Sequence, residues 1–156
     1  MLRFYRANSE ATGCCASFYV NRQGNIMMKF VKQASYNKQN KSGDFKSNSK
    51  DPYKNAICKV SRIEAAGIID SFEHAIPYDF EHWSATQQVT CKFDKSNVLI
   101  ENLPNGFTIG LFKTVKVDKA KVNFSILLSR DETRLLVEEM KGFLSKTAIE
   151  TNASQD

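Results

Sequence analysis

The sequence is poor in the residues on which most catalytic and metal sites depend. Its 156 residues include only two histidines, His74 and His82, and neither belongs to an HExxH motif or to a Cys/His spacing that fits zinc. A Gly-rich phosphate-binding loop and a nucleophile-elbow motif are also missing. We therefore expect a protein that is not an enzyme and that uses no metal or cofactor.

Long apolar runs and paired cysteines are missing too. No stretch reaches the roughly 18 apolar residues of a membrane span, and the first six residues lack the apolar core of a secretion signal. Cys14 and Cys15 are adjacent, and Cys58 and Cys91 fall on predicted buried strand faces, so no CxxC spacing occurs. These features predict reduced thiols in a reducing compartment and no membrane contact. The cytoplasm of a bacterial or phage-infected cell is favoured, with an organelle or the nucleus as open alternatives.

Acidic residues are scarce in the first part of the chain. Residues 1–60 hold 11 Lys/Arg against 3 Asp/Glu, a balance of +8, whereas residues 61–156 hold 11 against 14, a balance of −3, which together give the net +5. This asymmetry favours a basic surface directed at a polyanion. A solvated charged face without a partner is the alternative.

The sequence does contain an internal repeat. Residues 56–64 and 124–132 each form an alternating apolar segment that runs into Ser-Arg-x-Glu, beginning at Ser61 and Ser129. Ser-x-x-Glu is a capping box, in which the serine oxygen accepts an amide hydrogen bond of the first helical turn and the glutamate accepts one from the serine amide. Each copy therefore predicts a strand followed directly by a capped helix. The matching apolar positions are Ala56, Cys58, Val60, Ala65, Ile68, Ile69, Phe72 and Ile76 in the first copy, and Phe124, Ile126, Leu128, Thr133, Leu136, Val137, Met140 and Leu144 in the second.

The remaining patterns predict one domain of the α+β class, with two repeats of four antiparallel strands followed by a helix. The predicted strands cover 14–21, 26–33, a short segment around Phe45, 54–60, 78–84, 86–94, 106–115 and 121–128, and the predicted helices run from Ser61 to about His74 and from Ser129 to about Lys146. The expected connecting segments are an arm over 1–13, a connection over 95–105 with a Pro104-Asn105-Gly106 turn, and a flexible tail over 147–156. Repeat one then spans about 13–75, and repeat two about 76–146, of a single domain over 1–156.

The segment 36–55 has a composition of its own. Five lysines are interleaved there with Tyr36, Phe45 and Tyr53, and its only acids are Asp44 and Asp51. We expect a mobile hairpin loop. Lysines for phosphates and ring faces for bases are what a single-strand binder uses, whereas a flexible solubilising loop is the alternative.

In this order, these segments resemble the Whirly family of single-stranded-nucleic-acid-binding proteins. The match is carried by the Ser-x-x-Glu strand and helix over 58–67, the Met-rich strand over 26–30, the acidic-Phe-x-His segment over 79–82, and the last strand and helix over 122–144. The family's Lys-Gly-Lys motif is reduced to Gly13 followed by small residues, and the long basic loop is unlike the plant proteins. The resemblance is therefore to a distant member, of phage or bacterial type.

The resemblance implies sheets splayed outwards from helices that form the core of a homotetramer. It also implies largely sequence-independent binding of single-stranded DNA in replication, recombination, repair or transcription. RNA binding on the same scaffold and docking of a protein through the basic loop are the alternatives. The candidate binding residues are Lys29, Lys32, Lys46, Lys54 and Lys92 for phosphates and Tyr36, Phe45, Tyr53 and Trp83 for bases. Half-buried packing is the alternative role for Trp83. Phe30 and Phe93 could also stack on bases, but their strand positions fit the core better.

Overall fold

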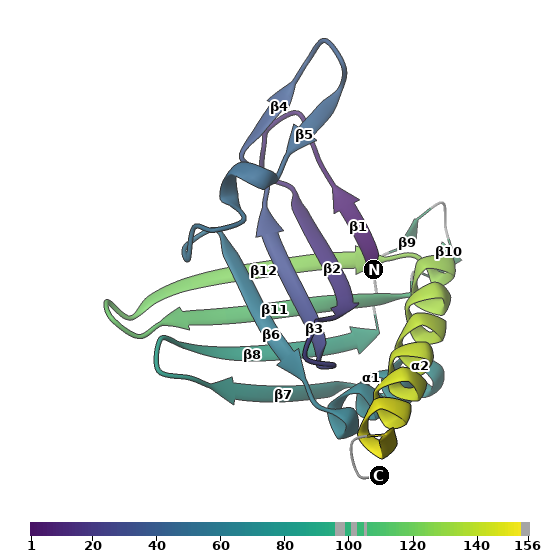
Figure 1. The fold of residues 1–156 in the computed structure, drawn as a ribbon. Coiled ribbons are helices and arrows are strands. Elements are labelled where there is room, and N and C mark those ends of the chain that lie inside the picture. Colours follow the sequence, from purple (N-terminus) through teal and green to yellow (C-terminus); the bar gives the residue numbers. More distant parts are fainter. Residues whose placement is uncertain (96–98, 101–102, 105, 154–156) are drawn as a thin grey trace.

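The computed structural model describes residues 1–95, 99–100, 103–104 and 106–153, whose elements are labelled in Figure 1. Those of the first half are β1 (Leu2–Arg6), β2 (Cys14–Val20), β3 (Ile26–Lys32), β4 (Ser35–Asn37), β5 (Ser42–Asp44), the 3-10 helix η1 (Lys46–Asn48), β6 (Asn55–Val60) and α1 (Arg62–His74). Those of the second half are β7 (Tyr78–Trp83), β8 (Gln87–Lys95), β9 (Leu99–Ile100), β10 (Leu103–Pro104), β11 (Phe107–Val115), β12 (Ala120–Leu128) and α2 (Arg130–Ala153).

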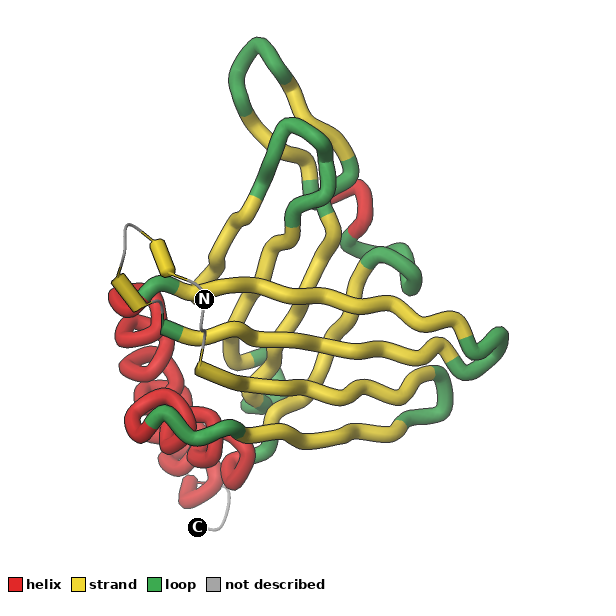
Figure 2. Tube along the Cα trace, turned by 180° about the vertical axis from the view of Figure 1, so that it is seen from behind, coloured by secondary structure: helices red, strands yellow, loops and turns green. Residues whose placement is uncertain are grey.

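Two four-stranded antiparallel sheets form the body of the molecule. Sheet 1 has the order β1-β2-β3-β6 and is followed by α1, and sheet 2 has the order β12-β11-β8-β7 and is followed by α2. The strands of the two sheets cross, and both helices lie together at one end of sheet 2 (Figures 1 and 2). The prediction of an α+β fold with two repeats of four strands and a helix is confirmed.

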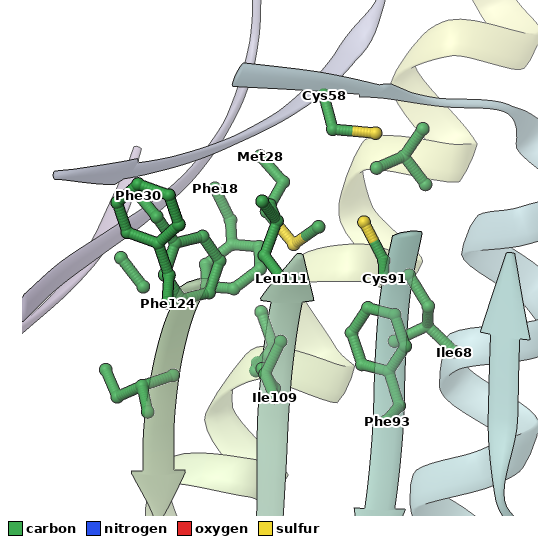
Figure 3. Close-up of a cluster of buried hydrophobic side chains, with 14 of the residues drawn as sticks. Phe18, Met28, Phe30, Cys58, Ile68, Cys91, Phe93, Ile109, Leu111 and Phe124 are labelled. Atoms are coloured by element: carbon green, nitrogen blue, oxygen red, sulfur yellow. The ribbon is translucent and has the colours of Figure 1, made fainter. Parts of the chain in front are cut away.

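The hydrophobic core lies between the sheets (Figure 3). Phe30 of sheet 1 meets Phe124 of sheet 2, with 6.1 Å between the ring centroids. Phe93 packs on Phe72 of α1 at 5.9 Å, so the helix closes the same core. Phe30 and Phe93 are fully buried, as the alternation of their strands predicted. The single chain therefore builds its interior from both sheets and from the buried faces of both helices.

Both predicted capping boxes are present. The Glu64 amide donates to Ser61 Oγ at 3.1 Å, and the Ser61 amide donates to Glu64 Oε1 at 2.8 Å. The equivalent distances between Glu132 and Ser129 are 3.2 and 3.0 Å. One predicted member of the first helix face is wrong. Ile76 lies beyond the end of α1, where Ala75 adopts a left-handed conformation with φ of 55°, and Ile76 is 50% exposed.

The predicted arm over 1–13 is wrong in part, because it contains β1. This strand pairs with β2 at the edge of sheet 1. Phe4 points into the core, where its ring lies 6.2 Å from that of Phe18. Repeat one therefore begins near Leu2 and not near residue 13. The fourth strand of sheet 1 is β1 and not the short strand expected around Phe45, because β5 ends at Asp44 and pairs with β4 in a separate sheet, whereas β1 buries Phe4 against the core.

The connection between β3 and β6, residues 33–54, forms a hairpin of β4 and β5 followed by η1. The hairpin extends beyond sheet 1 on the side away from the helices (Figures 1 and 2). Gln33 anchors its base: the side-chain carbonyl accepts from the amides of Asn8 and Gly13, and the side-chain amide donates to the carbonyls of Asn8 and Ser35. A hairpin was predicted here, and buried Gln33 ties it to the β1–β2 connection.

Two further segments differ from the predictions. The connection predicted over 95–105 contains the short strand pair β9–β10, and Asn105 of its predicted turn lies outside the described residues. The predicted flexible tail is wrong from residue 147 to 153, because α2 continues to Ala153. Arg62 of α1 holds this end by donating to the Leu144 carbonyl at 2.7 Å and to Thr147 Oγ1 at 2.5 Å.

Candidate nucleic-acid interface

A groove on the outer face of sheet 1 brings cations and aromatic rings together. Arg3 and Tyr5 of β1 and Lys29 of β3 alternate with buried residues and so point away from the core. Phe45 and Lys46, at the start of η1, border the same groove, whose volume is about 520 Å³. The ring centroids of Tyr5 and Phe45 are 5.7 Å apart. We call this site the outer groove.

The cations of the outer groove have no carboxylate partner in the described part of the chain. None of Arg3, Lys29 and Lys46 forms an ion pair there. Burial raises the pKa of the Cys15 thiol in the groove lining, while the Ser17 hydroxyl and the charges of Arg3 and Lys29 act to lower it. Two positive charges therefore act on one point of the lining, which suits the groove to an anionic group.

One acid, Asp44, also borders the outer groove. Its carboxylate accepts hydrogen bonds from the hydroxyl and the amide of Ser47, and these bonds lower its pKa, as does the charge of Lys46. The same bonds hold the start of η1, where Phe45 and Lys46 lie. Asp44 therefore shapes this wall of the groove, and three cations against one acid leave the groove positive.

The outer face of sheet 2 carries two exposed rings, each beside a lysine. Lys116 Nζ lies 5.6 Å from the ring centroid of Trp83, and Lys92 Nζ lies 5.5 Å from that of Phe112. The Phe112 ring covers Gly110, where an added Cβ would lie 3.0 Å from the ring. A ring with a neighbouring cation can stack on a base and contact its phosphate. We call these the ring–lysine pairs of sheet 2.

Other kinds of site find little support in the described ranges. No group of three His, Cys, Asp or Glu residues there could hold a metal ion. His82 Nε2 instead contacts the Glu64 carboxylate at 2.8 Å. The helices there are all too short or too polar to span a membrane. All four cysteines are free and buried; burial was predicted for Cys58 and Cys91 alone.

No known family model and no curated protein matches the sequence. Solved structures do match. The plant transcriptional regulator PBF-2 matches with a TM-score of 0.65 and 15% identity, over 99% of this chain and 85% of that chain. WHY3 from Arabidopsis thaliana matches with a TM-score of 0.64 and 12% identity, over 99% and 91% of the two chains. The chain has the Whirly fold. A guide-RNA-binding protein complex bound to a gRNA is also similar, with a TM-score of 0.61 and 14% identity, over 94% and 90%.

The Whirly fold places the predicted binding residues on several surfaces. Lys29, Phe45 and Lys46 meet in the outer groove. Trp83 and Lys92 lie on the outer face of sheet 2, in the two ring–lysine pairs. Trp83 is 65% exposed, so its ring is available for stacking and is not half-buried.

Lys32 and Lys54 lie apart from the outer groove. They border a separate cavity of about 430 Å³, and Lys32 Nζ is 5.5 Å from the ring centroid of Phe124. Lys32 follows Phe30 by two positions and so points to the inner side of sheet 1, opposite to Lys29. The two strand lysines therefore serve different surfaces.

The two remaining tyrosines are placed differently from the other predicted rings. Tyr36 lies in β4 opposite Gly43, outside the outer groove. Tyr53 donates from its hydroxyl to Asp118 Oδ2 at 2.6 Å. Its hydroxyl therefore joins the β3–β6 connection to the β11–β12 turn.

Sequence reasoning missed four residues of these surfaces. Arg3 and Tyr5 were assigned to an arm, although the alternation of Leu2 and Phe4 with them was a signal for a strand edge. Phe112 and Lys116 carried no motif of their own. Phe112 is recognised only when β11 pairs with β8, which brings Lys92 to its ring, and Lys116 only when the β11–β12 turn lies beside Trp83.

Proposed function

We propose that this protein binds single-stranded DNA with little sequence preference. The observation that carries the proposal is the outer groove. Arg3, Lys29 and Lys46, which have no ion-pair partner among the described residues, line it together with the rings of Tyr5 and Phe45. Stacking on a ring contributes about 1–3 kcal/mol per base and accepts every base. A duplex keeps its base faces inside the stack, so ring contacts favour single strands.

The ring–lysine pairs of sheet 2 support the same proposal, because they offer two further stacking positions on an outward face. RNA is the second candidate ligand. It is favoured by the guide-RNA-binding complex bound to a gRNA, which is similar in fold. The 2′-hydroxyl is the group by which a protein distinguishes RNA from DNA, so direct competition separates the two ligands.

We also propose that the protein assembles through its helices, as a homotetramer. Ile63 of α1 is 83% exposed and Leu135 of α2 is 47% exposed, although both helices bury other large apolar residues such as Ile68 and Leu136. Exposed apolar side chains on a helix surface favour an interface. A non-enzymatic role in replication, recombination, repair or transcription, in a reducing compartment, would suit such an assembly.

The test is fluorescence anisotropy with labelled dT oligonucleotide, matched RNA and duplex DNA, on protein whose mass is measured by light scattering. We expect tight dT binding by a tetramer and weak duplex binding. The logarithm of affinity should fall with the logarithm of salt by about 0.7 per phosphate contacted. Absence of binding to all three ligands at low salt would contradict the proposal and favour a protein partner for residues 33–54 between β3 and β6, which we call the basic connection. Tighter binding of RNA than of dT would indicate that the ligand is RNA and that it binds on the same surface.

A further inference from the structure

Lys113 is a buried lysine that points away from solvent, toward the end of the β3–β6 connection. It lies on the inner face of β11 and is 5% exposed. Its ammonium donates to the Pro52 carbonyl at 2.6 Å and to the Asn55 carbonyl at 2.9 Å. Burial lowers the pKa of Lys113, while Asp51 acts to raise it. A cation held inside by two carbonyls of one short segment fixes that segment to sheet 2.

A second contact joins the same two parts of the molecule at the surface. The Tyr53 hydroxyl donates to Asp118 Oδ2 at 2.6 Å, across 65 positions of sequence. Asp118 belongs to the β11–β12 turn, where it also accepts from the Ala120 amide at 3.0 Å. Tyr53 and Lys113 therefore hold one segment from two sides, from the surface and from the interior.

The segment they hold is also fixed to sheet 1. The Lys32 amide donates to the Lys54 carbonyl at 2.8 Å, and Asn48 Nδ2 donates to the Lys32 carbonyl at 2.9 Å. Asn55 Nδ2 closes the segment by donating to the Ser49 carbonyl at 2.7 Å. The basic connection is thus bound to both sheets at the end that follows Phe45 and Lys46.

We propose that Lys113, Tyr53 and Asp118 are positioning residues for nucleic-acid binding, which hold the basic connection in its binding conformation without touching the ligand. The inference rests on the proposed function. A segment that is ordered before binding loses less conformational freedom on binding, so its phosphate contacts contribute more to affinity.

Asp118 provides a test in which simple electrostatics and positioning predict opposite results. Asp118→Ala removes a negative charge from a protein that binds a polyanion, so charge alone would raise the affinity for dT oligonucleotide. Positioning predicts a fall of about threefold to tenfold at low salt, because the connection is released from sheet 2. Asp118→Asn is the matched control, since it removes the same charge and can still accept from Tyr53; its affinity should equal or exceed that of the unchanged protein.

Tyr53→Phe tests the same contact from the other side, with the ring and all charges retained. We expect it to weaken binding as much as Asp118→Ala does, and the double variant to bind no more weakly than either single variant. The salt dependence should also decrease, by about 0.7 in slope for each phosphate contact that is lost. A merely structural role would lower the melting temperature and leave this slope unchanged in the folded protein.

Lys113→Met tests the buried contact, with thermal unfolding followed in parallel to show that the variant is folded at the assay temperature. We expect the largest loss of affinity and of salt slope here. If the unchanged protein binds no oligonucleotide, the proposed function fails. If it binds, and Tyr53→Phe and Asp118→Ala bind as tightly with the same slope, the positioning role alone is overturned.

Discussion

The two repeats of this chain are built alike and differ most in one connection. In each sheet the third strand is followed by the fourth, which runs directly into a capped helix. In repeat one the link between these strands is residues 33–54, with a hairpin and η1. In repeat two it is the short turn 116–119. The two links meet where Tyr53 contacts Asp118.

This comparison shows where the chain tolerates change. Most strand and helix positions facing the core are apolar in both repeats, with buried Lys113 as an exception, because each contacts its counterparts across the sheets. The links lie at the surface, so their length and charge are free to differ. In repeat one, the long basic link borders the outer groove of sheet 1. In repeat two, the short turn leaves the outer face of sheet 2 uncovered.

The largest effect on the free energy of unfolding is expected from a comparison of the inner and outer faces of sheet 2. Phe93→Ala should lower the free energy of unfolding by about 3–5 kcal/mol, because a ring in contact with Phe72 and Phe80 leaves a cavity. Phe112→Ala, on the outer face, should lower it by less than about 1 kcal/mol. Urea unfolding of the two variants measures both. Equal losses would mean that Phe112 also belongs to a packed core.

The next prediction contrasts the outer groove with the ring–lysine pairs. Phe45→Ala and Trp83→Ala should each weaken dT binding by about 1–3 kcal/mol, because each ring is expected to stack on one base. Neither should dissociate the oligomer. Tyr36→Ala is the control, since Tyr36 lies outside both surfaces. Anisotropy titrations and light scattering check the set, and unchanged affinity for Phe45→Ala would remove the outer groove from the binding surface.

The capping boxes test how far the repeats are equivalent. Ser61→Ala and Ser129→Ala should each lower the free energy of unfolding by about 1 kcal/mol, because each loses one hydrogen bond to a helix amide. Thermal or urea unfolding of the two variants gives the comparison. A clear effect in only one variant would show that the caps, although alike in geometry, do not contribute alike.

The smallest effect concerns acid pH and the second cap. Burial raises the pKa of Glu132, but the Arg6 guanidinium at 2.5 Å and the Ser129 bonds outweigh it and hold that pKa below its usual range. A carboxylate with a lowered folded pKa stabilises the fold above its unfolded pKa of about 4.3 and loses this contribution as the pH falls through the folded value. Glu132→Gln, which keeps a capping oxygen, should therefore flatten the stability profile below about pH 5. If the free energy of unfolding depends on pH in the same way for both proteins from pH 3 to 7, the ion pair of Arg6 and Glu132 does not stabilise the fold as proposed.

Much of the fold follows from the sequence alone, because the signals are local. Alternation along β6 and β12 and the apolar faces of both helices determined which residues are buried. The Ser-x-x-Glu motifs determined where the helices begin. Lys29, Phe45 and Lys46 were found as candidate binding residues because a basic segment with aromatic residues is visible in composition.

Only the tertiary structure decided how these residues combine. The tertiary fold brings Arg3 and Tyr5 of β1 to Phe45 of the β3–β6 connection. It also brings Asp118 to Tyr53 and a buried lysine to the Pro52 and Asn55 carbonyls. Such contacts join residues far apart in the chain, and no local pattern encodes them. The sequence by itself determined the two repeats and the basic character of the connection in repeat one, and the tertiary fold decided which cations and rings share a surface, because that depends on contacts between distant segments.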